Sequence, residues 1–239
     1  MRFPALPLLG ALAAAGCTIA AETTSGPARD VRPALTAACE HAFGITPAPT
    51  IPPGRPAFVH LAPLDFGRLE RAEAALGSVL LRRDTVTYFS GVTRHESTYQ
   101  RTDPAVPGMP VTVHYTEHLA PEPYYRSRAD GVVRDFHYRW GSGGSPPSAP
   151  QPAERLGGLL RRYEAIRAEV LEAFGPPMDS RPLTCAPCGE SGLTMAHRSD
   201  LWLERGAEVQ MDLVFDVPCV EAPQRHADQR MTVRVYHDP

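Results

Sequence analysis

The spacing of apolar residues along the chain predicts three helices. The clearest pattern covers residues 156–174, where apolar side chains recur every three or four positions and Gly175 follows. An earlier helix is expected to begin after Asp65, whose carboxylate can cap it, and to end at Gly77. A shorter helix is expected within residues 30–43.

Apolar and polar residues alternate in the segments that follow the two longer helices, and this alternation predicts β-strands. The expected strands cover residues 79–89, either continuous or broken near Asp84, then 92–99, 111–116, 132–140, 193–203, 208–216 and 230–236. The dipeptide Asp130-Gly131 favours a tight hairpin before the strand at 132–140. The segment around Cys185 is expected to form a loop, because Pro182, Pro187 and Gly189 interrupt it.

These patterns indicate an α+β fold in which helices pack on an antiparallel sheet, with two similar helix-plus-strands units. The expected organisation is a signal peptide over residues 1–16, a Pro-rich linker with a short helix over 17–56, a first unit over 57–140, a flexible linker over 141–152, and a second unit over 153–239. The helix ends of the two units are alike, since Ala72–Gly77 resembles Val170–Gly175. A true internal repeat and convergent helix endings both explain this similarity.

The N-terminus has the pattern of an export signal. Arg2 is followed by an uncharged stretch, rich in Leu and Ala, that is too short to cross a bilayer but suits a signal peptide. The stretch ends in Ala13-Ala14-Ala15-Gly16-Cys17. This segment resembles the lipobox of bacterial lipoproteins, although Ala14 stands where the motif usually has Leu.

The resemblance implies cleavage after Gly16 and lipidation of Cys17, which would anchor the protein to a membrane. Thr18 is not the Asp associated with inner-membrane retention, so the resemblance favours the outer membrane or a periplasm-facing anchor. The alternative is an ordinary secretory signal cut after Ala20 or Ala21.

Composition and charge narrow the function classes. The chain has 239 residues and 24 Lys plus Arg residues, all of them Arg, at a formal net charge of −3. Without Lys there is no P-loop and no Schiff-base lysine. The Arg residues are scattered, so we expect no nucleic-acid partner; the expected partners are a membrane and another envelope protein.

The five cysteines are an odd number for an exported protein. Lipidation of Cys17 would leave an even set, and structural disulfides are then expected among Cys39, Cys185, Cys188 and Cys219, with three connectivities open. The Cys185-Ala186-Pro187-Cys188 motif also allows a redox dithiol or a four-Cys zinc site.

No complete catalytic motif is present in the sequence. His95-Glu96-Ser97-Thr98-Tyr99 has Tyr where a metalloprotease requires a second His, and the segment has a strand pattern. His114 and His118 would lie about 13 Å apart on a strand, too far for one metal ion. Gly189-Glu190-Ser191-Gly192 is followed by Leu193 and lacks the last Gly of a nucleophile elbow. We therefore assign no catalytic residue, no metal site and no cofactor.

Aromatic residues gather near the Asp130-Gly131 turn. Tyr124, Tyr125 and Trp140 could line a ligand surface, or they could be part of the sheet core. The sequence thus favours a non-enzymatic binding or scaffold module of the cell envelope. A hydrolase whose site is assembled from distant residues, and a redox or metal-binding protein acting through Cys185 and Cys188, are the alternatives.

Overall fold

The computed structural model describes residues 32–44, 58–89, 91–104, 106, 109–119, 132–141, 152–204, 206–221, 223, 225 and 227–238. All described residues belong to one compact unit.

The helices lie where the apolar spacing predicts them: α1 covers Arg32–Phe43, α2 covers Phe66–Ala75 and α3 covers Pro152–Phe174. Asp65 caps α2, since its side chain accepts a hydrogen bond of 2.8 Å from the backbone N–H of Arg68. Gly77 and Gly175 follow α2 and α3 with positive φ angles of 75° and 73°, so both helices end at a left-handed glycine.

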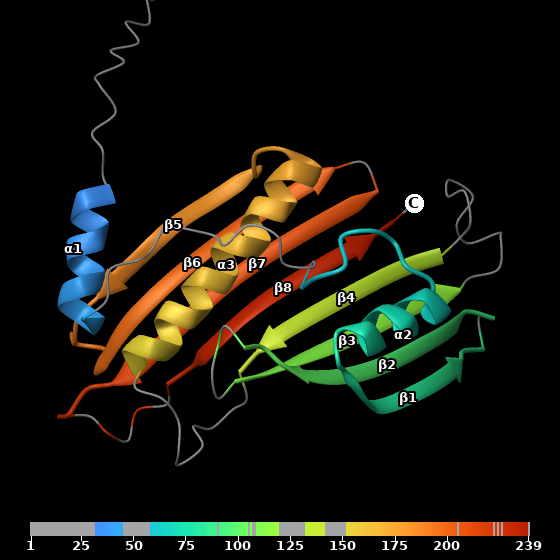
Figure 1. The fold of residues 1–239 in the computed structure, drawn as a ribbon, viewed down its shortest axis with the longest axis horizontal. Coiled ribbons are helices and arrows are strands. Elements are labelled where there is room, and N and C mark those ends of the chain that lie inside the picture. Colours follow the sequence, from blue (N-terminus) through green and yellow to red (C-terminus); the bar gives the residue numbers. More distant parts are fainter. Residues whose placement is uncertain are drawn as a thin grey trace, which may run out of the picture. The chain divides into compact units, whose positions relative to one another are not determined.

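Eight antiparallel strands form one sheet in the order β1-β2-β3-β4-β8-β7-β6-β5 (Figure 1). Their bounds are β1 Val79–Thr87, β2 Thr93–Thr102, β3 Pro110–Leu119, β4 Val132–Trp140, β5 Asp179–Ala186, β6 Leu193–Glu204, β7 Ala207–Pro218 and β8 Gln229–His237. The predicted α+β class with an antiparallel sheet is confirmed. The two halves of the chain contribute four strands each, and they meet where β4 pairs with β8.

The predicted loop before Cys188 is wrong, because residues 179–186 form the edge strand β5. Pro182 lies where the β5–β6 register shifts between Arg181 and Thr184. An edge strand tolerates proline at such an irregularity, because no ladder hydrogen bond is lost there. The break expected near Asp84 is also absent: β1 is continuous, and its register shift falls between Leu80 and Arg82.

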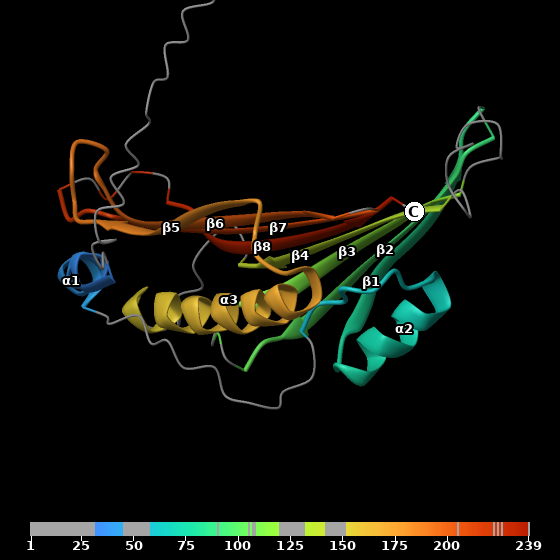
Figure 2. The same ribbon diagram turned by 90° about the horizontal axis from the view of Figure 1, so that it is seen from above.

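The three helices lie on the same side of the sheet (Figure 2). Buried side chains of α3, among them Leu159, Tyr163 and Ile166, belong to one hydrophobic cluster with side chains of the central strands, including Val113 and Met211. Successive strand residues point to opposite faces. Because the three helices lie on one side, the opposite face of the sheet is not covered by any helix that the structure describes. We call it the open face.

Two buried charge networks join the helices to the sheet. Arg162 of α3 donates two hydrogen bonds of 2.7 Å to Asp103, which also accepts one of 2.8 Å from the indole of Trp140. Glu73 of α2 is fully buried and accepts hydrogen bonds from Arg101 and Ser78. Charged groups inside a protein require such partners, and these contacts supply them for Arg162, Asp103 and Glu73.

Two disulfides join segments that are distant in the chain. Cys39 of α1 is bonded to Cys185 of β5, across 146 residues, and Cys188 is bonded to Cys219, across 31 residues. The expectation of structural disulfides is confirmed, and it points to an oxidising compartment outside the cytoplasm.

Candidate functional site

The open face presents one row of exposed side chains at its centre. Each of the four central strands, β3, β4, β8 and β7, has a single exposed position in its burial pattern. Those positions are His114, His137, Arg234 and Gln210, and each lies directly opposite the next across the paired strands. We call these four residues the exposed row. Its four members share one face only because the strand registers align them.

Two shallow hollows lie at the ends of the exposed row. The first, of about 190 Å³, includes His114 and its cross-strand neighbour Thr98. The second, of about 250 Å³, includes Gln210, Leu201 and Asp179. The register continues this line of residues through both hollows, from Arg82 on β1 to Asp179 on β5, so the line crosses all eight strands, with the apolar Leu201 as its member on β6.

The charges on the open face are segregated. The second hollow is lined by four carboxylate residues and one guanidinium: Asp179, Asp200, Glu208, Asp212 and Arg181. The centre of the face, by contrast, carries His114, His137, Arg139 and Arg234 on adjacent strands. Arg234 is compensated by Asp135, with an N–O distance of 2.7 Å. The open face thus has a basic centre beside an acidic hollow.

The two histidines of the row lie close together and are held differently. Their ring centroids are 6.4 Å apart. Nδ1 of His114 shares a hydrogen bond of 3.1 Å with the Thr98 hydroxyl. Burial, with the positive charges of His114, Arg234 and Arg139, holds the pKa of His137 below its ordinary value of 6.5, against the opposing effect of Asp135. His137 is therefore neutral at pH 7.

The structure describes one of the three residues of the sequence-predicted aromatic surface. Trp140 is fully buried in the core and donates to Asp103. Tyr124, Tyr125 and Cys17 lie outside the described residues. Sequence reasoning considered His114 together with His118, whereas the structure pairs His114 with His137. The alternation of apolar and polar residues predicts which face of a strand each histidine lies on. It does not predict which residue of the neighbouring strand lies opposite.

The described residues offer two arrangements that resemble catalytic groups, and neither assembles a nucleophile. His95 lies on strand β2, so the H-E-S-T-Y segment does not present a helical metal site. Nε2 of His60 lies 2.9 Å from Glu73, but the Ser78 hydroxyl donates to that same carboxylate and not to the histidine. A hydroxyl becomes a nucleophile when a base takes its proton, and no contact between Ser78 and His60 provides this.

The C-x-x-C motif is divided between two disulfides. Cys185 and Cys188 are bonded to different partners, Cys39 and Cys219, and not to each other. One group among the described residues has the spacing of metal ligands, namely Cys188, Cys219 and Glu221 within 4.8 Å. Its two sulfurs are joined in the disulfide, and a metal would require them as thiolates.

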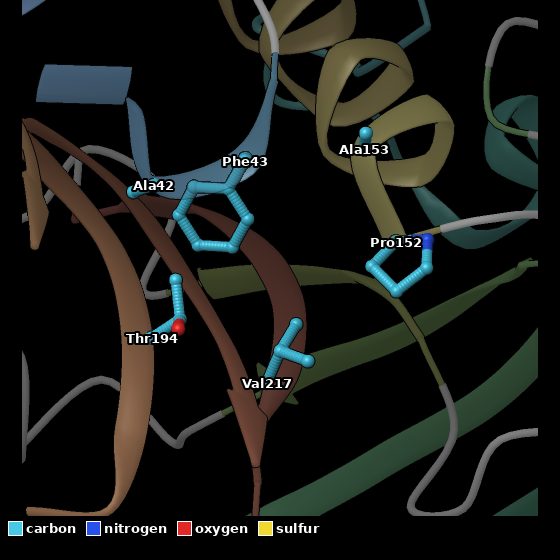
Figure 3. A pocket seen from close by; sticks show the side chains of 6 residues that line it. All are labelled: Ala42, Phe43, Pro152, Ala153, Thr194 and Val217. Atoms are coloured by element: carbon cyan, nitrogen blue, oxygen red, sulfur yellow. The ribbon is translucent and has the colours of Figure 1, made fainter. Parts of the chain in front are cut away.

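A separate pocket lies between α1, the start of α3, and strands β6 and β7 (Figure 3). Its volume is about 250 Å³, and its lining is Ala42, Phe43, Pro152, Ala153, Thr194 and Val217. Among the described residues, Thr194 supplies the one polar side chain of this lining, and no titratable group belongs to it. Such a pocket offers apolar contact but no acid, base or metal ligand.

Comparison with protein-family models, with curated proteins and with solved structures finds no match to this chain. No helix among the described residues is long and apolar enough to cross a membrane.

Proposed function

We propose that this protein is an exported envelope lipoprotein, anchored through Cys17, that binds a protein partner on the open face of its sheet and performs no chemistry of its own. The lipobox-like segment ending at Cys17 and the two disulfides support the anchor and the compartment. The exposed row is the observation that carries the binding function.

Three properties of the exposed row favour recognition over a purely structural role. Its side chains donate or accept hydrogen bonds, and Arg is among the residues enriched in protein interfaces. Polar hollows lie at both of its ends. The row also lies on strands, which hold side chains in defined positions better than loops do.

We also infer that α2 and α3 pack on the sheet as equivalent helices of an internal repeat. Each is followed by four consecutive antiparallel strands, and β4 and β8 both have nine residues. The β4–β8 register is centred on His137 and Arg234, which would then be equivalent positions. A register shift in the first strand of each half, β1 and β5, adds to the likeness.

Site-specific photocrosslinking in the native envelope tests the binding function. A photoreactive residue at Gln210 or Thr232, on the open face, is expected to give one discrete adduct. The same residue at the exposed, helix-side Arg161 should give none. The adduct should be lost when Arg234→Glu is added and kept when Arg71→Glu is added on α2. Adducts of equal yield from both sides of the sheet, or no adduct from the open face, would refute the proposal.

The mass of the mature protein tests the anchor. Protein extracted from membranes, thiol-blocked at lysis, should begin at a diacylated Cys17 and should contain no blocked thiols. The Cys17→Ala variant should lose the added mass and leave the membrane fraction. A lipid-free chain that begins near Ala21 would exclude the anchor without touching the binding proposal.

A further inference from the structure

The guanidinium of Arg139 lacks a charged partner on the open face. Other arginines there are paired: Arg234 with Asp135, Arg94 with Glu96, and Arg230 with Asp228. Within the described part of the chain, Arg139 has no carboxylate at ion-pair distance, and its buried Nε has no hydrogen-bond partner. The guanidinium therefore keeps a positive charge that no carboxylate of the described residues offsets, and an anion bound at this surface can form charge-assisted hydrogen bonds with it.

The neighbours of Arg139 complete a set of donors. Thr112 and Thr232 lie directly opposite Arg139 on β3 and β8, so a hydroxyl flanks it on each side. His137 lies two residues along the same face of β4, and His114 lies opposite His137. A guanidinium can donate two parallel hydrogen bonds to the oxygens of one carboxylate, and the adjacent hydroxyls and imidazoles can donate others.

We infer that Arg139, with His137 and His114, forms an anion subsite that receives a carboxylate of an acidic segment in the partner protein. This inference rests on the proposed function, because it names the chemistry of the partner that the open face binds. We call these three residues the carboxylate subsite.

The distribution of charge around the subsite favours a protein over a polyanion. Asp212 on β7 lies directly opposite Thr232 of β8, one strand further from Arg139. The second hollow also contains Asp179 and Glu208. A phosphate-rich surface that extends over the whole face would be repelled by these carboxylates, whereas a short acidic segment can bind at the basic centre alone. A protein segment can place an acidic side chain on the basic centre and a basic or neutral one at the hollow.

The affinity of the carboxylate subsite for a carboxylate should depend on pH. The charged or titratable groups that face His137 are His114 from β3, Arg234 from β8, and Asp135 and Arg139 from its own strand. His137 is neutral at pH 7 and gains a proton only below its ordinary pKa. Its protonated ring attracts a carboxylate more strongly, so binding should tighten as the pH falls below about 6.5.

Calorimetric titration of the full-length, detergent-extracted protein with hexaglutamate tests the inference. We expect measurable binding at low salt, weakened about tenfold by Arg139→Gln. Arg139→Lys, which keeps the charge but loses the two-pronged donor, should weaken it less. Arg161→Gln on α3 is the matched control and should change the affinity less than twofold. Binding should tighten from pH 8 to pH 5.5, and replacing both His114 and His137 by Gln should remove most of that change. Circular dichroism checks that each variant folds.

Three outcomes would overturn the inference: hexaglutamate binding that Arg139→Gln leaves unchanged, equal binding of inorganic phosphate at the same concentration, or Arg139-dependent binding of phosphatidylglycerol vesicles in its place. These outcomes are separable from the binding function, because photocrosslinking from Gln210 does not depend on the carboxylate subsite. If the adduct forms while hexaglutamate fails, the open face binds its partner through other chemistry.

Discussion

His137 faces Arg234 directly across the β4–β8 strand pair, where the two halves of the chain meet. The two side chains come from opposite halves of the sequence, yet they occupy the middle of one exposed row. Both are exposed on the open face, while their neighbours along each strand are buried. The surface most suited to binding therefore lies at the junction of the two halves and belongs to neither half alone.

The buried pair of Arg162 and Asp103 should contribute strongly to the stability of the fold. We expect Asp103→Ala to lower the free energy of unfolding by about 3–5 kcal/mol, because it leaves the buried guanidinium and the Trp140 indole without their acceptor. Replacement of the exposed Arg82 by Ala should cost less than about 1 kcal/mol, since its pair with Asp84 lies in solvent. Urea denaturation measures both. Equal losses would show that the buried network is not a main support of the fold.

The pH dependence of stability should show how much the ionised carboxylate of Glu73 stabilises the fold. Burial alone would raise the pKa of its carboxyl, but hydrogen bonds from His60, Ser78 and Arg101 and the positive charge of Arg101 outweigh burial and lower it. A carboxyl whose pKa is lower in the folded state stabilises the fold above the unfolded pKa, near 4.5, and this contribution is lost as the pH falls.

The wild-type protein should therefore lose stability steeply below about pH 4.5. The Glu73→Gln variant should be less stable at neutral pH and should show a shallower decline in acid. Thermal unfolding across pH 3 to 7 provides the measurement. Parallel curves for the two proteins would mean that Glu73 makes no such contribution.

The two disulfides should differ in their contribution to stability. On the chain-entropy model, the Cys39–Cys185 bond, across 146 residues, stabilises the fold by about 5 kcal/mol, and the Cys188–Cys219 bond, across 31 residues, by about 4 kcal/mol. Replacing each pair by serines and comparing urea midpoints tests the order. A larger loss from the shorter loop would assign the stabilisation to local packing instead of chain entropy.

The edge strand β1 should be the site of self-association at high concentration. Val79 and Leu81 are 63% and 55% exposed there, whereas the opposite edge strand, β5, is tied to α1 by the Cys39–Cys185 disulfide. An unpaired edge with exposed apolar side chains invites pairing with another chain.

The Leu81→Arg variant should stay monomeric to higher concentrations than the wild type in light-scattering measurements, with an unchanged melting temperature. Leu203→Arg, an exposed position on β6, is the control and should not differ from the wild type. Equal association by all three proteins would show that β1 is not the site of self-association.

The sequence by itself determined the elements whose signals are local. The apolar spacing of α3, the cap at Asp65 and the glycine at residue 77 each act within a few residues, and each is found where it was predicted. Strand alternation likewise separated the buried side chains of β7 and β8 from the outward-facing ones.

Tertiary structure alone decided three further features. The strand β5 was missed because Pro182 normally excludes a strand, and only an edge position with a register shift tolerates it. The partners of Cys185 and Cys188 depend on which segments the fold brings together. The exposed row depends on the register between strands, which joins His137 to Arg234 across 97 positions of sequence. Local residue patterns carry no information about such distant pairs, because their contact energy arises only after the chain has folded.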